Sequence, residues 1–418
     1  MAMRQGVAPR LTAVLMRGVA RRMARHAAPS SIAEVPPLAL AIRQAREILI
    51  VALAEAGDMV LLSPFLRELR RAVPGARITL VTMQSGAILL GRSPVVDQIR
   101  IFPTAVSRLL RPLLLPRRAR RFAREELGSG FDVAIVPRWD TDHHLATAVA
   151  LYSGAARRVG FTEHSTARRS TLNAGFDALL TDVIESAGTA HEVERHLALL
   201  RALGVEPQSS RLQSWLTDDD RQRAAELLPP PSNDQMLVAF GIGAAHPKRR
   251  WPAARFAEVA RILEREHRAR VVVVGGPDDI AAQQEILRVL PRNATGLAGR
   301  LTFRETAAAL AHCALFIGND SAPMHLAAAA GVPCVEISCH PLTGDPAHNN
   351  APERFGPWGV ANTVLRPPRP VPPCDDGCRA AGPHCILEVT AEAVIGAAAA
   401  LLTEQDRTST ATELRGTP

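Results

Sequence analysis

The sequence has few of the residues that mark several common classes of protein. One lysine, one tyrosine and an aromatic content of 4% leave few side chains that could stack on nucleic-acid bases. No uninterrupted apolar run approaches the roughly 18 residues of a membrane-spanning helix. The N-terminal apolar patch, Leu11 to Met16, is too short for a secretory signal. We therefore expect a cytoplasmic protein that binds no nucleic acid, and whose six cysteines are free thiols or metal ligands rather than disulfides.

Arginine supplies nearly all of the positive charge, and it is concentrated in two stretches. The net charge of +8 is best explained by a general preference for arginine over lysine. Residues 1–46, however, hold eight arginines against one acidic residue, Glu34, and residues 108–124 mix seven arginines with bulky apolar side chains. Such stretches suit an anionic membrane surface, here the inner face of the membrane, or an acidic acceptor. A solvated tail and an exposed helix are the alternative explanation.

The order of apolar segments predicts two α/β domains of similar kind. At 418 residues the chain is long enough for two cores. Strands and helices alternate in both halves, which predicts two Rossmann-like, doubly wound domains that face each other across a cleft. The domains that we predict are a basic N-terminal extension at 1–45, an N-terminal domain at 46–212, a C-terminal domain at 213–403 and a disordered tail at 404–418. The strands that we predict are 48–53, 77–82, 97–102, 131–136 and 157–161 in the first half, and 236–241, 270–274, 314–317 and 333–337 in the second.

The stretch from Phe316 to Pro333 has the strongest pattern for a ligand site. An apolar run ends in Gly318, and a helix is predicted to begin after Asp320 or Ser321, either of which is a good N-cap. The first turn of such a helix presents unpaired N–H groups and a positive dipole end, which suit a diphosphate. An ordinary crossover, in which the acidic residue only caps the helix, is the alternative.

Two further strand ends carry glycine beside charged residues. The strand that ends near Leu53 is followed by Gly57-Asp58 and an amphipathic helix, which places Asp58 at the edge of the sheet where ligands usually bind. In the second half, Gly243 lets a ligand approach the backbone, and the basic run from Lys248 to Arg250 can neutralise a pyrophosphate. Asp279, after the next strand, is a candidate for ribose hydroxyls or for a helix cap. Together these strand ends favour a nucleotide diphosphate.

From these motifs the chain resembles glycosyltransferase family 9, the lipopolysaccharide heptosyltransferases, which have the GT-B fold. The resemblance covers roughly residues 46–403. Its motifs are Gly318-Asn-Asp-Ser-Ala-Pro-Met-His325, Lys248-Arg-Arg-Trp-Pro252 before Phe256, and Gly57-Asp58 with Ser63-Pro64. The resemblance implies that Asp58 is the catalytic base for an inverting transfer. It also implies a set of residues that bind the donor. One is the family's usual lysine, whose position is held here by Arg249 with Lys248 beside it. The others are Asp279, Leu301, Asp320, Ser321, Ala322 and His325.

The remaining candidates concern the acceptor and a metal. We expect Gly57, Arg138, Asp140 and His143 to contact the acceptor. Asp140 and Asp142 have the spacing of a metal clamp, but the family pattern requires none. Cys374, Cys378 and Cys385 lie in a cysteine-rich segment whose three-residue spacer is longer than usual for a metal site. We favour free thiols there, because a metal would need His384 or Cys339 as its fourth ligand.

The function that the sequence predicts is transfer of a sugar from a nucleotide-diphosphate donor, most simply heptose from ADP-heptose, to a hydroxyl acceptor. No cofactor is required for this chemistry. The acceptor is left open between a lipid-linked saccharide, a small metabolite and a protein side chain. A nucleotide-sugar epimerase of GT-B fold and an inactive nucleotide-sugar-binding protein are the alternatives, and the Gly57-Asp58 turn argues against both.

Overall fold

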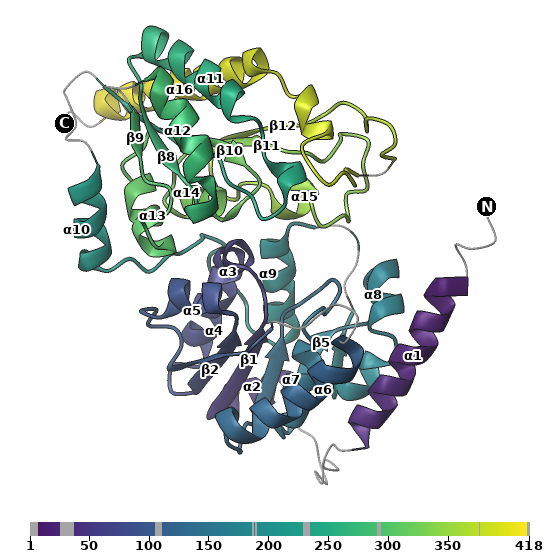
Figure 1. Cartoon of the computed structure of the whole chain (residues 1–418). Helices are drawn as coiled ribbons and strands as arrows, with labels where there is room; N and C mark the ends of the chain where they lie inside the picture. Colours follow the sequence, from purple (N-terminus) through teal and green to yellow (C-terminus); the bar gives the residue numbers. More distant parts are fainter. Residues whose placement is uncertain are drawn as a thin grey trace. The chain divides into compact units, whose positions relative to one another are not determined.

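The computed structural model describes residues 7–25, 37–104, 111–185, 188, 190–228, 235–290, 294–375 and 377–415. Contacts divide the chain into two compact units, which are described separately (Figure 1). Most of the first unit comes from the N-terminal half. The second unit comprises Arg211–Pro418 and two short segments from earlier in the chain, Ala56–Leu61 and Thr189–Glu192. The second of these segments is tied to its unit by Glu192, whose carboxylate accepts a 2.8 Å hydrogen bond from the buried Arg354.

The first unit is built on a parallel sheet of six strands in the order β3-β2-β1-β4-β5-β6. This is the order of a dinucleotide-binding fold, in which the order reverses beside the first strand. The strands are β1 (Glu47–Ala52), β2 (Arg77–Thr82), β3 (Gln98–Ile101), β4 (Val133–Val136), β5 (Arg157–Phe161) and β6 (Asp182–Ile184). The helices are α1 (Val7–Ala24), α2 (Leu38–Gln44), α4 (Ser63–Ala72), α5 (Gln84–Leu90), α6 (Arg111–Phe122), η3 (Ala123–Leu127), α7 (Ala146–Tyr152), α8 (Ala167–Leu172), η4 (Phe176–Leu179) and α9 (Glu192–Ala202).

The central strands of this sheet are apolar at nearly every position because both faces are covered. In β1 the residues from Ile48 to Ala52 are all buried, as expected of a parallel strand between two helical layers. One face is covered by α6 and α7, and the N-terminal helix α1 packs on α6, α8 and η4 through Met16, Val19 and Met23, which are at most 6% exposed. Within the described residues, no helix has both the length and the apolar character needed to cross a bilayer.

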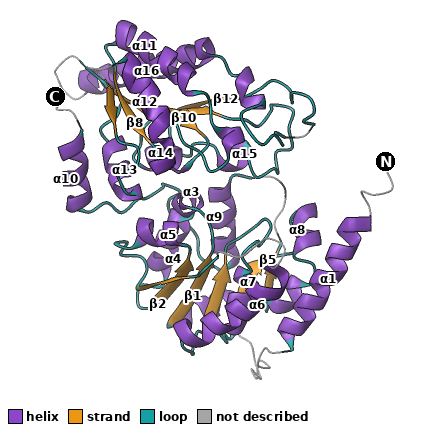
Figure 2. Cartoon of the chain, in the orientation of Figure 1, coloured by secondary structure: helices purple, strands orange, loops and turns teal. Residues whose placement is uncertain are grey.

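The second unit repeats the same arrangement, with the order β12-β11-β10-β7-β8-β9 (Figure 2). The pairs are again parallel. The strands are β7 (Leu237–Gly241), β8 (Arg270–Val274), β9 (Ala294–Gly296), β10 (Leu315–Asn319), β11 (Cys334–Ile337) and β12 (Asn362–Leu365). The helices are α3 (Ala56–Leu61), α10 (Asp218–Leu227), η5 (Pro247–Arg249), α11 (Ala253–His267), η6 (Pro277–Asp279), α12 (Ile280–Val289), α13 (Phe303–Leu310), α14 (Ala322–Ala329), α15 (Pro352–Phe355), η7 (Cys385–Glu388) and α16 (Ala391–Arg415).

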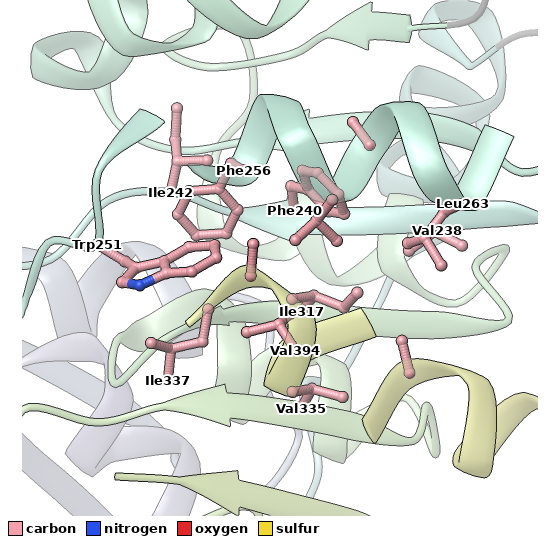
Figure 3. Close-up of a cluster of buried hydrophobic side chains, with 14 of the residues drawn as sticks. Val238, Phe240, Ile242, Trp251, Phe256, Leu263, Ile317, Val335, Ile337 and Val394 are labelled. Atoms are coloured by element: carbon pink, nitrogen blue, oxygen red, sulfur yellow. The ribbon is translucent and has the colours of Figure 1, made fainter. Parts of the chain in front are cut away.

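The core of the second unit lies between one face of this sheet and helices α11, α12 and α16 (Figure 3). Alternate residues of the strands point into it, as the two-residue period of a strand requires. Phe256 of α11 is fully buried, stacks obliquely on Phe240 at 5.5 Å between ring centroids, and meets the edge of Trp251 at 5.0 Å. These aromatic contacts anchor α11 directly behind the basic run from Lys248 to Arg250.

The predicted fold class is confirmed, since both units have the doubly wound parallel sheet. The sequence analysis missed the three edge strands β6, β9 and β12, which have only three or four residues each and whose side chains are mostly half-buried, so that no apolar pattern marks them. Helix α16 continues to Arg415, into the stretch for which the sequence predicts a disordered tail. Residues 404–415 contain no glycine or proline to stop a helix, and they include several strong helix formers.

We expect Phe256→Ala to lower the free energy of unfolding by about 3–5 kcal/mol, because it leaves a cavity in the core of the second unit. Ile280→Ala, at a position that is 44% exposed, should cost less than about 1 kcal/mol. Urea denaturation followed by circular dichroism measures both. Equal effects of the two substitutions would contradict the core described above.

Candidate functional site

The turn after β1 packs against the helix after β10. Helix α3, which carries Gly57 and Asp58, belongs to the second unit and contacts α14. A Cβ atom at Gly57 would lie 2.8 Å from Cδ2 of His325 and 3.5 Å from Cα of Ala322. Glycine allows this approach without displacing the His325 ring. The structure therefore brings together two of the predicted motifs, although about 260 residues separate them in the sequence.

Arg249 lies between the acidic residues of these two motifs. Its Nη1 donates a 2.9 Å hydrogen bond to Oδ2 of Asp320, and both side chains are mostly buried. Burial by itself would lower the pKa of Arg249. The negative charges of Asp320 and Asp58, together with the hydrogen bond to Asp320, outweigh it and raise the pKa above its ordinary value. The guanidinium is therefore charged, bound to Asp320 and stabilised by the negative charge of Asp58.

The buried amide of Asn319 links the two loops that carry these charges. Asn319 is fully buried, and its Nδ2 donates to the carbonyl of Ile242 at 2.8 Å. Its Oδ1 accepts a 3.0 Å hydrogen bond from the backbone N–H of Trp251. The sequence analysis did not single out this residue. A buried asparagine at the end of an apolar strand is the signal that could have identified it, because such an amide must find partners.

The N-terminus of α14 has the character expected of an anion site. Ser321 is the N-cap, but its hydroxyl donates to the carbonyl of Asn319 at 3.1 Å and does not cap the helix. Burial lowers the pKa of His325 to about 4, so the ring is neutral at neutral pH. Its buried Nδ1 has no hydrogen-bond partner in the described part of the chain. The N–H of a neutral imidazole and helix N–H groups that no side chain caps can both donate to an anionic ligand.

The two other donor candidates of this sheet edge have mainly local contacts. Asp279 is 7% exposed, accepts a 2.8 Å hydrogen bond from the backbone N–H of Gly276, and lies 3.6 Å from Nη1 of Arg250. Its carboxylate also packs on Gly243, where a Cβ atom would lie 2.1 Å from Oδ2. Asp279 thus caps η6, as the alternative interpretation supposed, and its carboxylate fills the space that the missing side chain of Gly243 leaves. Leu301 is half-buried in the loop between β9 and α13.

Lys248 has a different partner from its neighbour Arg249. Its Nζ donates a 2.6 Å hydrogen bond to the carbonyl of Cys378, in the cysteine-rich segment before η7. There the Cys339 thiol hydrogen-bonds the Cys378 sulfur and holds the pKa of Cys378 well below its ordinary value. The structure also brings His384 next to the three cysteines of this segment, as a group that could hold a metal ion.

Three of the predicted acceptor residues, Arg138, Asp140 and His143, lie in the first unit, in the loop after β4, whereas the fourth, Gly57, belongs to the second unit. Nε of Arg138 is paired with Oδ1 of Asp140 at 2.5 Å. Burial, with the positive charges of Arg168 and Arg138, lowers the pKa of His143 to about 4. Asp142 accepts hydrogen bonds from the backbone N–H groups of Ala146 and Thr147 and from the Thr147 hydroxyl, so its carboxylate caps α7.

Two buried arginines that the sequence analysis missed support this loop. Arg169 is 2% exposed and donates to the carbonyls of Arg138, Trp139 and Asp140, and also to that of Phe161 at the end of β5. The guanidinium of Arg195 lies 3.3 Å from the ring centroid of Trp139. In a sequence so rich in arginine, nothing distinguishes these two from the many exposed ones.

Comparison with known proteins identifies the family. The model of glycosyltransferase family 9 (heptosyltransferase) matches residues 120–379. Lipopolysaccharide heptosyltransferase 3 of Escherichia coli is 26% identical over 67% of this chain and 79% of its own length. Lipopolysaccharide heptosyltransferase 2 of the same organism is 26% identical over 70% of this chain and 82% of its own length.

Solved structures agree with this match. A family 9 glycosyltransferase from Veillonella parvula superposes with a TM-score of 0.68 and 25% identity, covering 86% of this chain and 98% of the other. The E. coli ADP-heptose heptosyltransferase II superposes with a TM-score of 0.61 at 22% identity, covering 86% and 99%. Given the matched family model, which spans more than half of the chain, this protein belongs to glycosyltransferase family 9, the heptosyltransferase family.

Proposed function

We propose that this glycosyltransferase transfers heptose from ADP-heptose to a hydroxyl group of a saccharide acceptor, with inversion at the anomeric carbon. The names of its relatives support the donor and a role in lipopolysaccharide biosynthesis. The observation that carries the proposal is the packing of the Asp58 helix on α14, beside the pair formed by Arg249 and Asp320. A potential base and an anion-binding helix end thus occur in one compact unit.

The donor side of the proposed site stabilises the leaving group. As the bond between the anomeric carbon and the diphosphate oxygen breaks, negative charge grows on the departing ADP. Arg249 and the first-turn N–H groups of α14 supply fixed positive charge for it. We assign the role of the family's lysine to Arg249 rather than to Lys248, because the ammonium of Lys248 is bound to the carbonyl of Cys378.

The acceptor is activated by Asp58 in this proposal. Its carboxylate takes the proton of the acceptor hydroxyl while the oxygen forms a bond to the anomeric carbon. We further propose that Arg138 and His143 contact the acceptor, for which Arg138 contributes charge and the neutral His143 a hydrogen bond. The hydrogen bonds of Arg169 to this loop keep these side chains in place.

We also propose that α1 binds an anionic membrane surface, where a lipid-linked acceptor would be found. Leu11, Val14 and Leu15 are 65%, 64% and 53% exposed on the face of the helix that points away from the core. Exposed arginines surround them, namely Arg10, Arg17, Arg21, Arg22 and Arg25. An exposed apolar face among arginines has the chemistry of a helix that lies in the interface of an anionic bilayer.

The substitution Asp58→Asn tests the proposed base. We expect kcat for transfer from ADP-heptose to fall by about 10²- to 10⁴-fold, because the amide cannot accept the acceptor's proton. The Kd for ADP should be retained. Asp218→Asn, at a fully exposed position, is the matched control and should leave both quantities unchanged. Unchanged turnover by the Asp58 variant would exclude the carboxylate as the base.

Binding of nucleotides to an Arg249→Gln variant tests the donor site. ADP should stabilise the wild-type protein against heat more than UDP, GDP or TDP does, and the variant should bind ADP about 10- to 100-fold more weakly. Arg261→Gln on the exposed side of α11 should bind like the wild type. A stronger response to another nucleotide would leave the family membership intact but reject ADP-heptose as donor.

Vesicle binding tests the proposed role of α1. The triple variant Leu11→Ser, Val14→Ser, Leu15→Ser should bind vesicles that contain phosphatidylglycerol about tenfold more weakly than the wild type does. The reason is that the variant has no apolar side chains at these three positions to transfer from water into the bilayer interface. Ile280→Ser removes an exposed apolar residue elsewhere and should have no effect. Flotation assays measure the bound fraction. Equal binding to neutral phosphatidylcholine vesicles would argue against electrostatic attraction.

A further inference from the structure

Four potential metal ligands converge where the segment after β12 runs into the first residue of η7. The Sγ atoms of Cys374, Cys378 and Cys385 and a ring nitrogen of His384 all lie within 4.8 Å of one another. Cys378 and Cys385 are fully buried, and the other two are partly buried. The cysteines are free thiols, so no disulfide accounts for their proximity.

The spacing of these atoms matches a tetrahedral site. With Zn–S bonds of about 2.3 Å and Zn–N bonds of about 2.0–2.1 Å, tetrahedral angles place neighbouring S and N ligand atoms about 3.6 Å apart. Nδ1 of His384 lies 3.7 Å from Sγ of Cys374 and 3.4 Å from Sγ of Cys385. The histidine therefore stands at the distance from two sulfurs that a shared zinc ion would impose.

Backbone groups around the cluster also suit negatively charged sulfur ligands. The N–H of Arg379 donates to Sγ of Cys374 at 3.3 Å. Backbone groups of Ala380 and Cys385 hydrogen-bond the Cys378 sulfur. Outer hydrogen bonds of this kind orient the ligands of a metal and offset the charge of thiolates.

We propose that Cys374, Cys378, His384 and Cys385 bind one structural Zn²⁺ ion. Three sulfurs and one imidazole are a closed tetrahedral set, which leaves no position for a substrate. The ion would replace the three thiol protons, release them to solvent, and fix a loop that has little regular secondary structure. The role is thus separate from the chemistry of sugar transfer.

The loop that would hold the ion also braces the basic run from Lys248 to Arg250. Lys248 binds the carbonyl of Cys378, and Nε1 of Trp251 donates to the carbonyl of Val389 at 2.9 Å. Nη1 of Arg255 donates to the carbonyls of Leu387 and Val389 at 2.6 and 2.7 Å. We therefore expect loss of the ion to weaken ADP binding as well, an effect that rests on the function proposed for Arg249.

Metal analysis of the full-length protein without an affinity tag tests the site directly. Inductively coupled plasma mass spectrometry should find one zinc per chain after growth with zinc and iron available. Cys374→Ser and Cys378→Ser should lose it, whereas Cys313→Ala, a buried cysteine outside the cluster, should keep it. Absence of stoichiometric metal from the wild type would overturn the proposal, and stoichiometric iron would overturn the assignment to zinc.

A second measurement avoids variants that fail to fold. Removing metal from the wild-type protein with a chelator should lower its melting temperature, and one equivalent of Zn²⁺ should restore it. Replacement by Co²⁺ should produce the thiolate-to-cobalt absorption bands of a tetrahedral sulfur-rich site. A melting temperature that chelation leaves unchanged, or a cobalt spectrum without those bands, would reject the site. Because neither readout depends on nucleotide, a failure here is distinguishable from a failure of the proposed transfer.

Discussion

The arrangement of the candidate site depends on one buried amide, that of Asn319. A buried amide must be hydrogen-bonded, and this one takes its partners from the loop that follows β7. It thereby fixes the position of Trp251 relative to the end of β10. Arg249 precedes Trp251 by two residues and Asp320 follows Asn319 directly, so the same link holds the two charges together. Burying two charges costs desolvation free energy, and their attraction offsets that cost only when the geometry of the ion pair is well fixed.

The sequence predicted those parts of the fold that local patterns determine. Strands such as β1 and β8 are apolar along most of their length because helices cover both faces, and Gly275 directly follows the last residue of β8. The motifs at Gly57-Asp58 and at Asp320 were predicted on the same basis. Edge strands such as β9 could not be predicted, because their pairing comes from a neighbouring strand rather than from their own side chains.

What local patterns cannot determine is the partner of each polar side chain. Lys248 and Arg249 are adjacent and carry the same charge, yet the turn of η5 directs one to the carbonyl of Cys378 and the other to Asp320. Composition gives no reason to prefer either for a phosphate. The buried Arg169 illustrates the same limit, since its role follows from the carbonyls that surround it and not from its residue type.

The membership of α3 in the second unit has a consequence for protein engineering. The segment that carries Asp58 is encoded between β1 and α4, two elements of the first unit, but its contacts are with α14. A hybrid enzyme made by joining two relatives near residue 211, where the chain passes into the second unit, would therefore combine an α3 from one parent with an α14 from the other. Compatible hybrids would have to exchange residues 56–61 together with the C-terminal half, as a single co-adapted block.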